Sequence, residues 1–362
     1  MRRSNLNSLP RSPAFDLRDT LKSTVSETER AQKPRHTPHV RAEFKNEVLA
    51  GLRASPRRLS SVYFYDDEGS ALFDEITRLP EYYLTRVEHE ILVSHAPDLD
   101  ALIGDEPCCV VDMGAGSGDK TQVLIEHMRK QGRDVRYAPV DVSAAALWSA
   151  EQTMQRRLPG LRVDPVHDEY IRGLSRVRAA QRGRRLIVLW LGSSIGNFDD
   201  AQAVEMLRGL AAECDAQDVL LVGFDLLKDP KALVAAYADS RGVTAEFNYN
   251  LLRRINRELG ANFQAEKFLH HATFSPLQSR MESYLLSRER QAVTVAGHNF
   301  ELDAWEPIHT EVSVKYSERR IAELLSRAGL RSIETFSDAQ RRFADVACRR
   351  AAQLGSQPGS HS

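Results

Sequence analysis

Short apolar runs alternate with helix-like segments through residues 108–225 of the chain. This alternation predicts an α/β fold in which a parallel sheet carries helices on both faces. The run Leu-Ile-Val-Leu-Trp-Leu at 186–191 has no polar residue, as expected of a strand that is buried on both faces. The predicted strands comprise residues 108–112, 136–141, 162–167, 185–191 and 219–224.

The alternation breaks after residue 225 and returns at about residue 315. The segment between is predicted to be helical at 232–237 and 247–259 and strand-like at 278–287 and 292–302; a helix at 318–328 and strands at 331–337 and 343–349 follow. The last two strands would complete a seven-stranded, Rossmann-like sheet. We therefore predict a main domain of residues 87–227 plus 315–352, and a second, substrate-binding lobe of residues 40–86 plus 228–314.

A glycine-rich turn follows the first predicted strand. Gly114, Gly116 and Gly118 alternate directly after Asp112, and a helix is predicted to start behind them. Glycines let the backbone pass close to a nucleotide-like ligand, and Asp141, at the end of the second strand, is placed to hold a ribose diol. A dinucleotide oxidoreductase would prefer G-x-G-x-x-G and a proton-relay residue. The G-x-G-x-G spacing instead favours S-adenosylmethionine as the cofactor.

Composition and charge narrow the choice of partners. The net charge of −1 argues against a nucleic-acid partner, and no apolar run approaches the roughly 18 residues that span a bilayer. The four cysteines have neither metal-ligand nor disulfide spacing, so we expect no metal and a reducing, cytoplasmic location. The polar residues 1–38 are predicted to be a disordered extension and residues 353–362 a flexible tail. We expect a monomer.

Several longer motifs carry a more specific resemblance. They are YFYDDEGSALFDEITRLPEYY at 63–83, LGSSIGN at 191–197, DLLKD at 225–229, AY at 236–237, GVTAEFN at 242–248, NREL at 256–259 and TEVSVK at 310–315. Over roughly residues 40–350 the chain resembles the histidine Nα-methyltransferase family of ergothioneine biosynthesis. The resemblance implies an enzyme that methylates the α-amine of free histidine three times to give hercynine, with S-adenosylmethionine and without a metal.

The resemblance also implies a set of site residues. Asn197 and Tyr237 would hold the carboxylate of the substrate and orient its amine, and Tyr65 and Tyr82 would border the amine and the imidazole. Glu311 and Ser313 would hydrogen-bond the imidazole. The residues implied to hold the cofactor are Gly114, Gly116, Lys120, Asp141 and Asp168.

One position departs from the family pattern. Where the family has Ile-Glu-Met in the strand that lines the imidazole pocket, this chain has Met281-Glu282-Ser283. The smaller and polar Ser283 would leave room for a water molecule or a bulkier ring. Another free amino acid is therefore an alternative substrate, and a cofactor-binding but inactive partner protein is a further alternative. The presence of Asn197, Tyr237 and Glu311 argues against an inactive protein.

Overall fold

The computed structural model describes residues 38–351. The predicted N-terminal extension and C-terminal tail lie outside the described residues, apart from Pro38, where helix α1 (Pro38–Arg53) begins. The chain forms two compact units, one that ends at Phe44 and one that starts at Lys45. Among the described residues, no helix combines the length and the apolar character that a membrane span requires.

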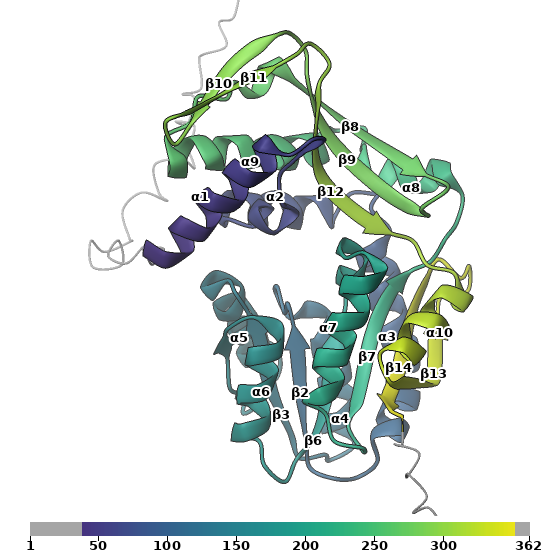
Figure 1. Cartoon of the computed structure of the whole chain (residues 1–362). Helices are drawn as coiled ribbons and strands as arrows, with labels where there is room; N and C mark the ends of the chain where they lie inside the picture. Colours follow the sequence, from purple (N-terminus) through teal and green to yellow (C-terminus); the bar gives the residue numbers. More distant parts are fainter. Residues whose placement is uncertain (1–37, 352–362) are drawn as a thin grey trace, which may run out of the picture. The chain divides into compact units, whose positions relative to one another are not determined.

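A large sheet with the order β13-β14-β7-β6-β2-β3-β4 forms the centre of the main domain (Figure 1). Its strands are β2 (Cys108–Met113), β3 (Val135–Asp141), β4 (Arg162–Val163), β5 (Val166–His167), β6 (Arg185–Trp190), β7 (Val219–Asp225), β13 (Leu330–Ser337) and β14 (Phe343–Arg350). Within this sheet, β7, β6, β2, β3 and β4 run parallel to one another. Strand β14 pairs with β7 in antiparallel orientation. The predicted Rossmann-like sheet is thereby confirmed.

The predicted strand at 162–167 is interrupted. Both β4 and β5 pair with β3, but Asp164 and Pro165 lie between them. Because proline has no amide N–H, it cannot donate a hydrogen bond to a neighbouring strand. The prediction of one continuous strand was wrong at this point, although the two pieces occupy the same edge of the sheet.

Two hydrophobic cores enclose the central sheet. Helices α3 (Leu84–Ile103), α4 (Asp119–Lys130) and α5 (Ala144–Arg157) contribute to one core, and α6 (Tyr170–Ala180), α7 (Asp200–Ala212) and α10 (Glu318–Arg327) to the other. Strands β2, β6 and β7 are apolar along almost their whole length because side chains on both of their faces are buried. The ends of these strands are therefore held rigidly.

A second sheet has the order β1-β12-β9-β8. Its strands are β1 (Arg57–Arg58), β8 (Phe268–Ser275), β9 (Arg280–Ser287) and β12 (Pro307–Val314), accompanied by α2 (Asp67–Ile76), α8 (Pro230–Tyr237), α9 (Val243–Leu259) and three short 3-10 turns, η1 (Ser61–Phe64), η2 (Ser194–Asn197) and η3 (Ala265–Lys267). Strand β1, from the N-terminal segment, pairs in parallel with β12. This pairing joins residues that are about 250 positions apart in the sequence, and the proposed lobe boundaries stay a prediction.

The predicted strand-like run at 292–302 is a hairpin rather than one strand. Strands β10 (Gln291–Val295) and β11 (His298–Leu302) pair antiparallel around Ala296 and Gly297, both of which have positive φ. Val293 and Val295 are buried before the turn and Phe300 and Leu302 after it, so the apolar alternation changes phase at the turn. This change of phase around Ala296 and Gly297 is the sequence signal of the reversal that the prediction of one strand missed.

The chain leaves the main domain after β7 and returns after β12 at the same place. The Tyr316 amide donates to the Asp225 carbonyl at 2.9 Å, and the Leu227 amide donates to the Tyr316 carbonyl at 2.9 Å. The outgoing and returning segments are thus hydrogen-bonded side by side. This crossing brings the end of β12 to the carboxyl end of β7.

Candidate active site

The glycine turn after β2 has the geometry that a close ligand requires. Gly114 has a φ of +76°, and a Cβ atom added there would lie 2.9 Å from the Tyr170 hydroxyl. A residue with a side chain would therefore be strained in its backbone and would collide with Tyr170. At Gly116, by contrast, a Cβ atom would meet no protein atom within 4 Å, so the turn borders open space on that side.

Asp141 ties the end of β3 to this turn. Its carboxylate accepts a hydrogen bond from the Ser143 amide at 2.8 Å, and the amide of Gly116 also hydrogen-bonds it. Burial raises the pKa of Asp141, while these backbone donors favour its ionised form. The carboxylate has more lone pairs than these donors use, and the remaining ones are available to a diol.

Asp112, by contrast, is occupied within the protein. It is buried, and it accepts hydrogen bonds from the Thr121 hydroxyl at 2.5 Å and the Tyr137 hydroxyl at 3.0 Å. These contacts join β2, β3 and α4 beneath the glycine turn. Asp112 thus supports the turn rather than facing a ligand.

Lys120 is the second residue of helix α4, and its side chain is held by a buried carboxylate. Its ammonium group donates to the fully buried Glu88 of α3, and the other oxygen of Glu88 accepts the Gly192 amide at 2.6 Å. An ammonium group has three donors, so Lys120 retains donors for a ligand carboxylate. Glu88 was not predicted; the sequence shows it only as a polar position in a helix.

Asp168 is held by arginines of α6. Its carboxylate lies 2.7 Å from Arg172 and 3.2 Å from Arg176. Burial alone would raise the pKa of Asp168, but the hydrogen bonds from the two arginines keep it below its ordinary value. The predicted contact of Asp168 with the cofactor stays a prediction, and any such contact shares the carboxylate with these arginines.

Three of the predicted substrate residues are tyrosines whose hydroxyls are influenced by the charge of Glu311. Desolvation and this charge raise the pKa of Tyr82 and of the buried Tyr237, and Glu311 also contributes to the raised pKa of Tyr65, whose side chain is 43% exposed. Tyr65 and Tyr82 both pack against Phe73 of α2, with ring centroids 5.4 and 6.1 Å from it. These tyrosines are consequently neutral phenols at physiological pH.

Glu311 itself lies opposite the position that departs from the family pattern. Ser283 of β9 and Glu311 of β12 are direct partners in the antiparallel ladder, and the Ser283 hydroxyl donates to a Glu311 oxygen at 3.2 Å. Burial raises the pKa of Glu311 to about 7, although Ser283 and Lys315 favour the ionised form. The side chain can therefore change its charge near neutral pH.

Two further polar groups follow Glu311 at the end of β12. Residues two apart in a strand point to the same face, so Ser313 lies in one row with Glu311, and Lys315, directly after the strand, extends this row by its hydrogen bond to Ser313. The buried Lys315 ammonium lies 2.7 Å from Asp225, 2.9 Å from the Ser313 hydroxyl and 3.0 Å from the Tyr237 hydroxyl. Lys315 and Asp225 both lie in motifs of the family resemblance, but neither was predicted to have a role in the site.

Asn197 lies at the end of η2, next to this row. A Cβ atom at the preceding Gly196 would lie 3.1 Å from the Val314 carbonyl and 3.4 Å from the Ser313 hydroxyl, so η2 packs directly on β12. Asn197 is exposed. Its amide is therefore accessible to a ligand beside Ser313.

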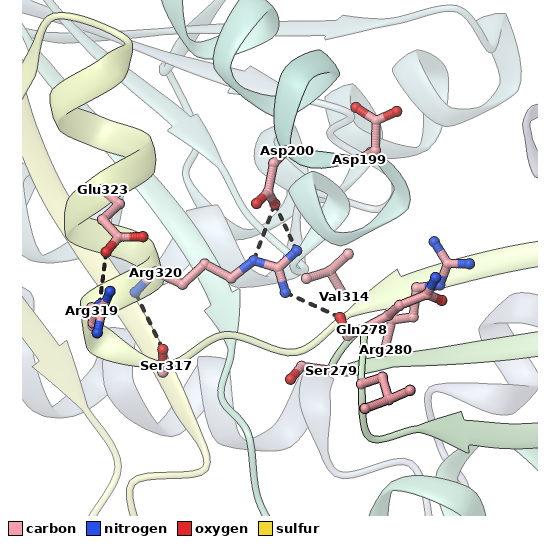
Figure 2. A pocket seen from close by; sticks show the side chains of 11 residues that line it. Asp199, Asp200, Gln278, Ser279, Arg280, Val314, Ser317, Arg319, Arg320 and Glu323 are labelled. Carbon is pink, nitrogen blue, oxygen red and sulfur yellow. Dashed lines mark hydrogen bonds and ion pairs between the residues drawn. The ribbon is translucent and has the colours of Figure 1, made fainter.

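A separate cavity of about 450 Å³ contains none of the predicted site residues (Figure 2). Figure 2 shows Arg320 reaching from α10 to Asp200 at 2.7 Å and to the Gln278 carbonyl at 3.3 Å. Arg319 is paired with Glu323 at 2.8 Å. Both α10 arginines that line this cavity are thus paired within the protein, and we assign it no ligand. Nor does any group of three or more His, Cys, Asp or Glu side chains within residues 38–351 form a metal site.

The strand order and the glycine turn with Asp141 define a methyltransferase of the S-adenosylmethionine-dependent class. The chain belongs to the family of histidine-specific, S-adenosylmethionine-dependent methyltransferases, which it matches over residues 44–350. It is 40% identical to the histidine N-alpha-methyltransferase of Mycolicibacterium smegmatis and 37% identical to that of Mycobacterium tuberculosis. Each match covers 82% of this chain and 91% of the relative.

More distant similarities extend beyond histidine enzymes. The chain is 27% identical to the 4-dimethylallyltryptophan N-methyltransferase of Trichophyton verrucosum, over 80% of this chain and 88% of that protein. Among solved structures, an S-adenosylmethionine-dependent methyltransferase from Clostridium acetobutylicum matches with a TM-score of 0.43 and 12% identity, over 77% of this chain and 98% of that one.

Proposed function

We propose that the protein transfers three methyl groups from S-adenosylmethionine to the α-amine of free L-histidine, giving hercynine. The observation that carries the proposal is the pair of Glu311 and Ser313 on one face of β12, with the Ser283 hydroxyl hydrogen-bonded to Glu311 and Lys315 joining Ser313 to the Tyr237 hydroxyl. Membership of the histidine-specific family supports the same reaction. We further propose that the enzyme works as a cytoplasmic monomer without a nucleic-acid or membrane partner, in keeping with its net charge of −1.

The residues near the glycine turn fit S-adenosylmethionine. The open space beside Gly116, the lone pairs of Asp141 and the spare donors of Lys120 match a nucleoside with a ribose diol and an amino-acid carboxylate. When bound, the cofactor supplies a methyl group on a positively charged sulfur. Methyl transfer is an in-line displacement, so most of the rate enhancement comes from the position of the acceptor nitrogen.

Glu311 provides the chemistry that distinguishes histidine. An ionised carboxylate accepts the ring N–H of a neutral imidazole, whereas an apolar amino acid would shield the half-buried carboxylate from water and leave it with the Ser283 hydroxyl as its donor. A site built on such a hydrogen bond rejects ligands that lack the donor much more strongly than an apolar pocket rejects a ligand of the wrong size. Histidine is therefore the acceptor that this pocket favours.

The α-amine must lose a proton before each transfer. The ordinary pKa of an α-amino group at a chain end is about 8; the adjacent carboxylate of a free amino acid raises this pKa, and burial lowers it, so no strong base is needed. In the first two transfers the neutral hydroxyls of Tyr65 and Tyr82 can accept hydrogen bonds from the amine N–H groups; the tertiary amine of the third transfer has no N–H. In that arrangement they direct the nitrogen lone pair without removing a proton themselves.

A competition assay tests the proposed acceptor. The purified protein is incubated with S-adenosylmethionine and an equimolar mixture of the twenty free amino acids, and the products are read by mass spectrometry. We expect histidine to be the amino acid that disappears. Consumption of another amino acid instead of histidine would identify that amino acid as the acceptor. All twenty are included because the smaller and polar Ser283 departs from the family pattern in the pocket. Cofactor binding without any methylation would indicate an inactive partner protein.

A further inference from the structure

Lys315 is a fully buried cation that joins the two sheets. It follows the end of β12, and its ammonium group lies 2.7 Å from a carboxylate oxygen of Asp225, which is also fully buried at the end of β7. Burying two charges carries a large desolvation cost, which the attraction within the pair offsets only with good geometry and additional hydrogen bonds. Lys315 makes two such hydrogen bonds, to Ser313 and Tyr237.

The hydrogen bonds of Lys315 fix the direction of a neighbouring hydroxyl. An ammonium group has three donors and no acceptor. In this structure the three donors reach Asp225, Ser313 and Tyr237. Tyr237 must therefore accept from Lys315, and Ser313 also hydrogen-bonds the Tyr237 hydroxyl. The hydrogen of the Tyr237 hydroxyl is left to point toward another group.

We propose that Lys315 is a positioning residue that makes the Tyr237 hydroxyl a donor aimed at the carboxylate of the amino-acid substrate. The inference rests on the proposed function, in which Tyr237 binds that carboxylate. Because the Lys315–Asp225 pair holds the hydroxyl before the substrate arrives, little orientational freedom is lost on binding. Tyr83 and Lys228 hold Asp225 from the other side, so the carboxylate that orients Lys315 is itself fixed.

The test compares two ligands that differ only in the carboxylate. Histidine and histamine share the imidazole and the amine, so any indirect effect of Lys315 on Glu311 changes both affinities alike. Affinities are measured by calorimetry in the presence of S-adenosylhomocysteine. We expect Lys315→Met to weaken histidine binding by about tenfold, the usual loss for a hydrogen bond to a charged group, and histamine binding by less than about twofold.

A double-mutant cycle separates orientation of the hydroxyl from simple charge attraction. If Lys315 acts through Tyr237, Lys315→Met has little further effect on the histidine-to-histamine affinity ratio in a Tyr237→Phe background. If the effect of Lys315→Met on the ratio persists in that background, the lysine attracts the carboxylate directly and the proposal is overturned. An unchanged ratio in the single variant also overturns it.

Two variants control for a loss of folding. Lys315→Met removes one of the two cations that pair with the buried Asp225, so the paired variant Asp225→Asn/Lys315→Met is measured beside it and should show the same altered ratio. Arg133, which forms a largely buried ion pair with Asp100, is the matched control. Arg133→Met should lower stability without changing the ratio. A ratio change in the control of the same size would show that any buried ion pair has this effect.

Failure of the proposed function gives a different result. If the unmodified protein binds another amino acid in place of histidine, that amino acid and its decarboxylated amine form the ligand pair, and the same ratio decides the role of Lys315. If it binds no free amino acid, the proposed function and the role of Lys315 are both rejected.

Discussion

Ser283 and Glu311 face each other across β9 and β12, and the Ser283 hydroxyl donates to the Glu311 carboxylate at 3.2 Å. Ser283 is the position at which this chain departs from the family pattern, and it is almost completely buried. The departure therefore does more than leave room in the pocket. It places a donor on the carboxylate that we propose reads the imidazole ring, and the ionised form of Glu311 is favoured as a result.

Removal of this donor should shift the pH dependence of the reaction. Burial raises the pKa of Glu311 to about 7, so kcat/KM for histidine should rise with pH through about 7 as Glu311 ionises. In Ser283→Ala the ionised form loses a hydrogen bond, and the rising limb should move upward by about half a pH unit or more, equivalent to roughly 0.7 kcal/mol. The pH profile of kcat/KM measures this shift.

Ser287 offers a matched control for that experiment. It is a buried serine of the same strand, but its hydroxyl donates to the Glu289 carbonyl. Ser287→Ala should leave the rising limb where it is. An unshifted limb in Ser283→Ala would mean that the titrating group is not Glu311.

Glu311 should decide the choice of substrate. Glu311→Ala is expected to lower kcat/KM for histidine by at least about tenfold, a loss of roughly 1.4 kcal/mol in transition-state binding. Turnover of an aromatic amino acid should fall less or increase, because the desolvation of an unpaired carboxylate no longer opposes it. Steady-state kinetics with both acceptors give the ratio, and intact histidine turnover in the variant would exclude this carboxylate from ring recognition.

Asp141 should contribute to cofactor affinity. Asp141→Ala is expected to weaken binding of S-adenosylmethionine by about 1–3 kcal/mol, as for a buried polar group left without its partner. Calorimetric titration measures the affinity. Asp134, a carboxylate that pairs with Arg184 at the surface, is the control, and Asp134→Ala should bind the cofactor normally. Equal affinities in the Asp141 variant and the unmodified protein would remove Asp141 from the site.

Asp345 should make stability depend on pH. It is fully buried, neither of its carboxyl oxygens has a hydrogen-bond partner among the described residues, and burial beside Glu88 raises its pKa well above the ordinary value. A raised pKa in the folded state favours folding at low pH. That contribution is lost as the pH rises from about 4 through the folded-state pKa.

Asp345→Asn should therefore stabilise the protein, by at least about 1 kcal/mol at pH 8, and the gain should shrink toward pH 4. Urea unfolding at several pH values measures the free energy of unfolding. A variant that is less stable than the unmodified protein at pH 8 would show that the ionised carboxylate has a stabilising partner in the folded protein.

The main sheet could be predicted because its strands are apolar on both faces and the glycine turn is local in sequence. Strands β8 and β12 could not be predicted in this way. β12 carries Thr310 and Ser313 at buried positions, so polar residues interrupt the apolar alternation that identifies a strand. Those residues are buried because the fold supplies their partners from distant segments, such as Asn248 for Thr310 at 2.7 Å.

In the candidate site, too, some features could be predicted from the sequence and others could not. The residues of the glycine turn and Asp141 follow from local spacing, and the substrate residues followed from the resemblance to a family. The pairing of Lys315 with Asp225 depends on the crossing of two chain segments 90 residues apart, and no local pattern encodes it. Arg172 and Arg176, which pair with Asp168, follow it by about one and two helical turns. The sequence nevertheless did not indicate that their side chains would point toward Asp168.

The reaction of histidine alone with S-adenosylmethionine tests the proposed activity most directly. The product is followed by mass spectrometry over time, and tandem fragmentation locates the added methyl groups. We expect histidine to gain one, two and then three methyl groups, all on the α-nitrogen. Methylation of an imidazole nitrogen, or no methylation of histidine under conditions in which the cofactor binds, would contradict the proposed function.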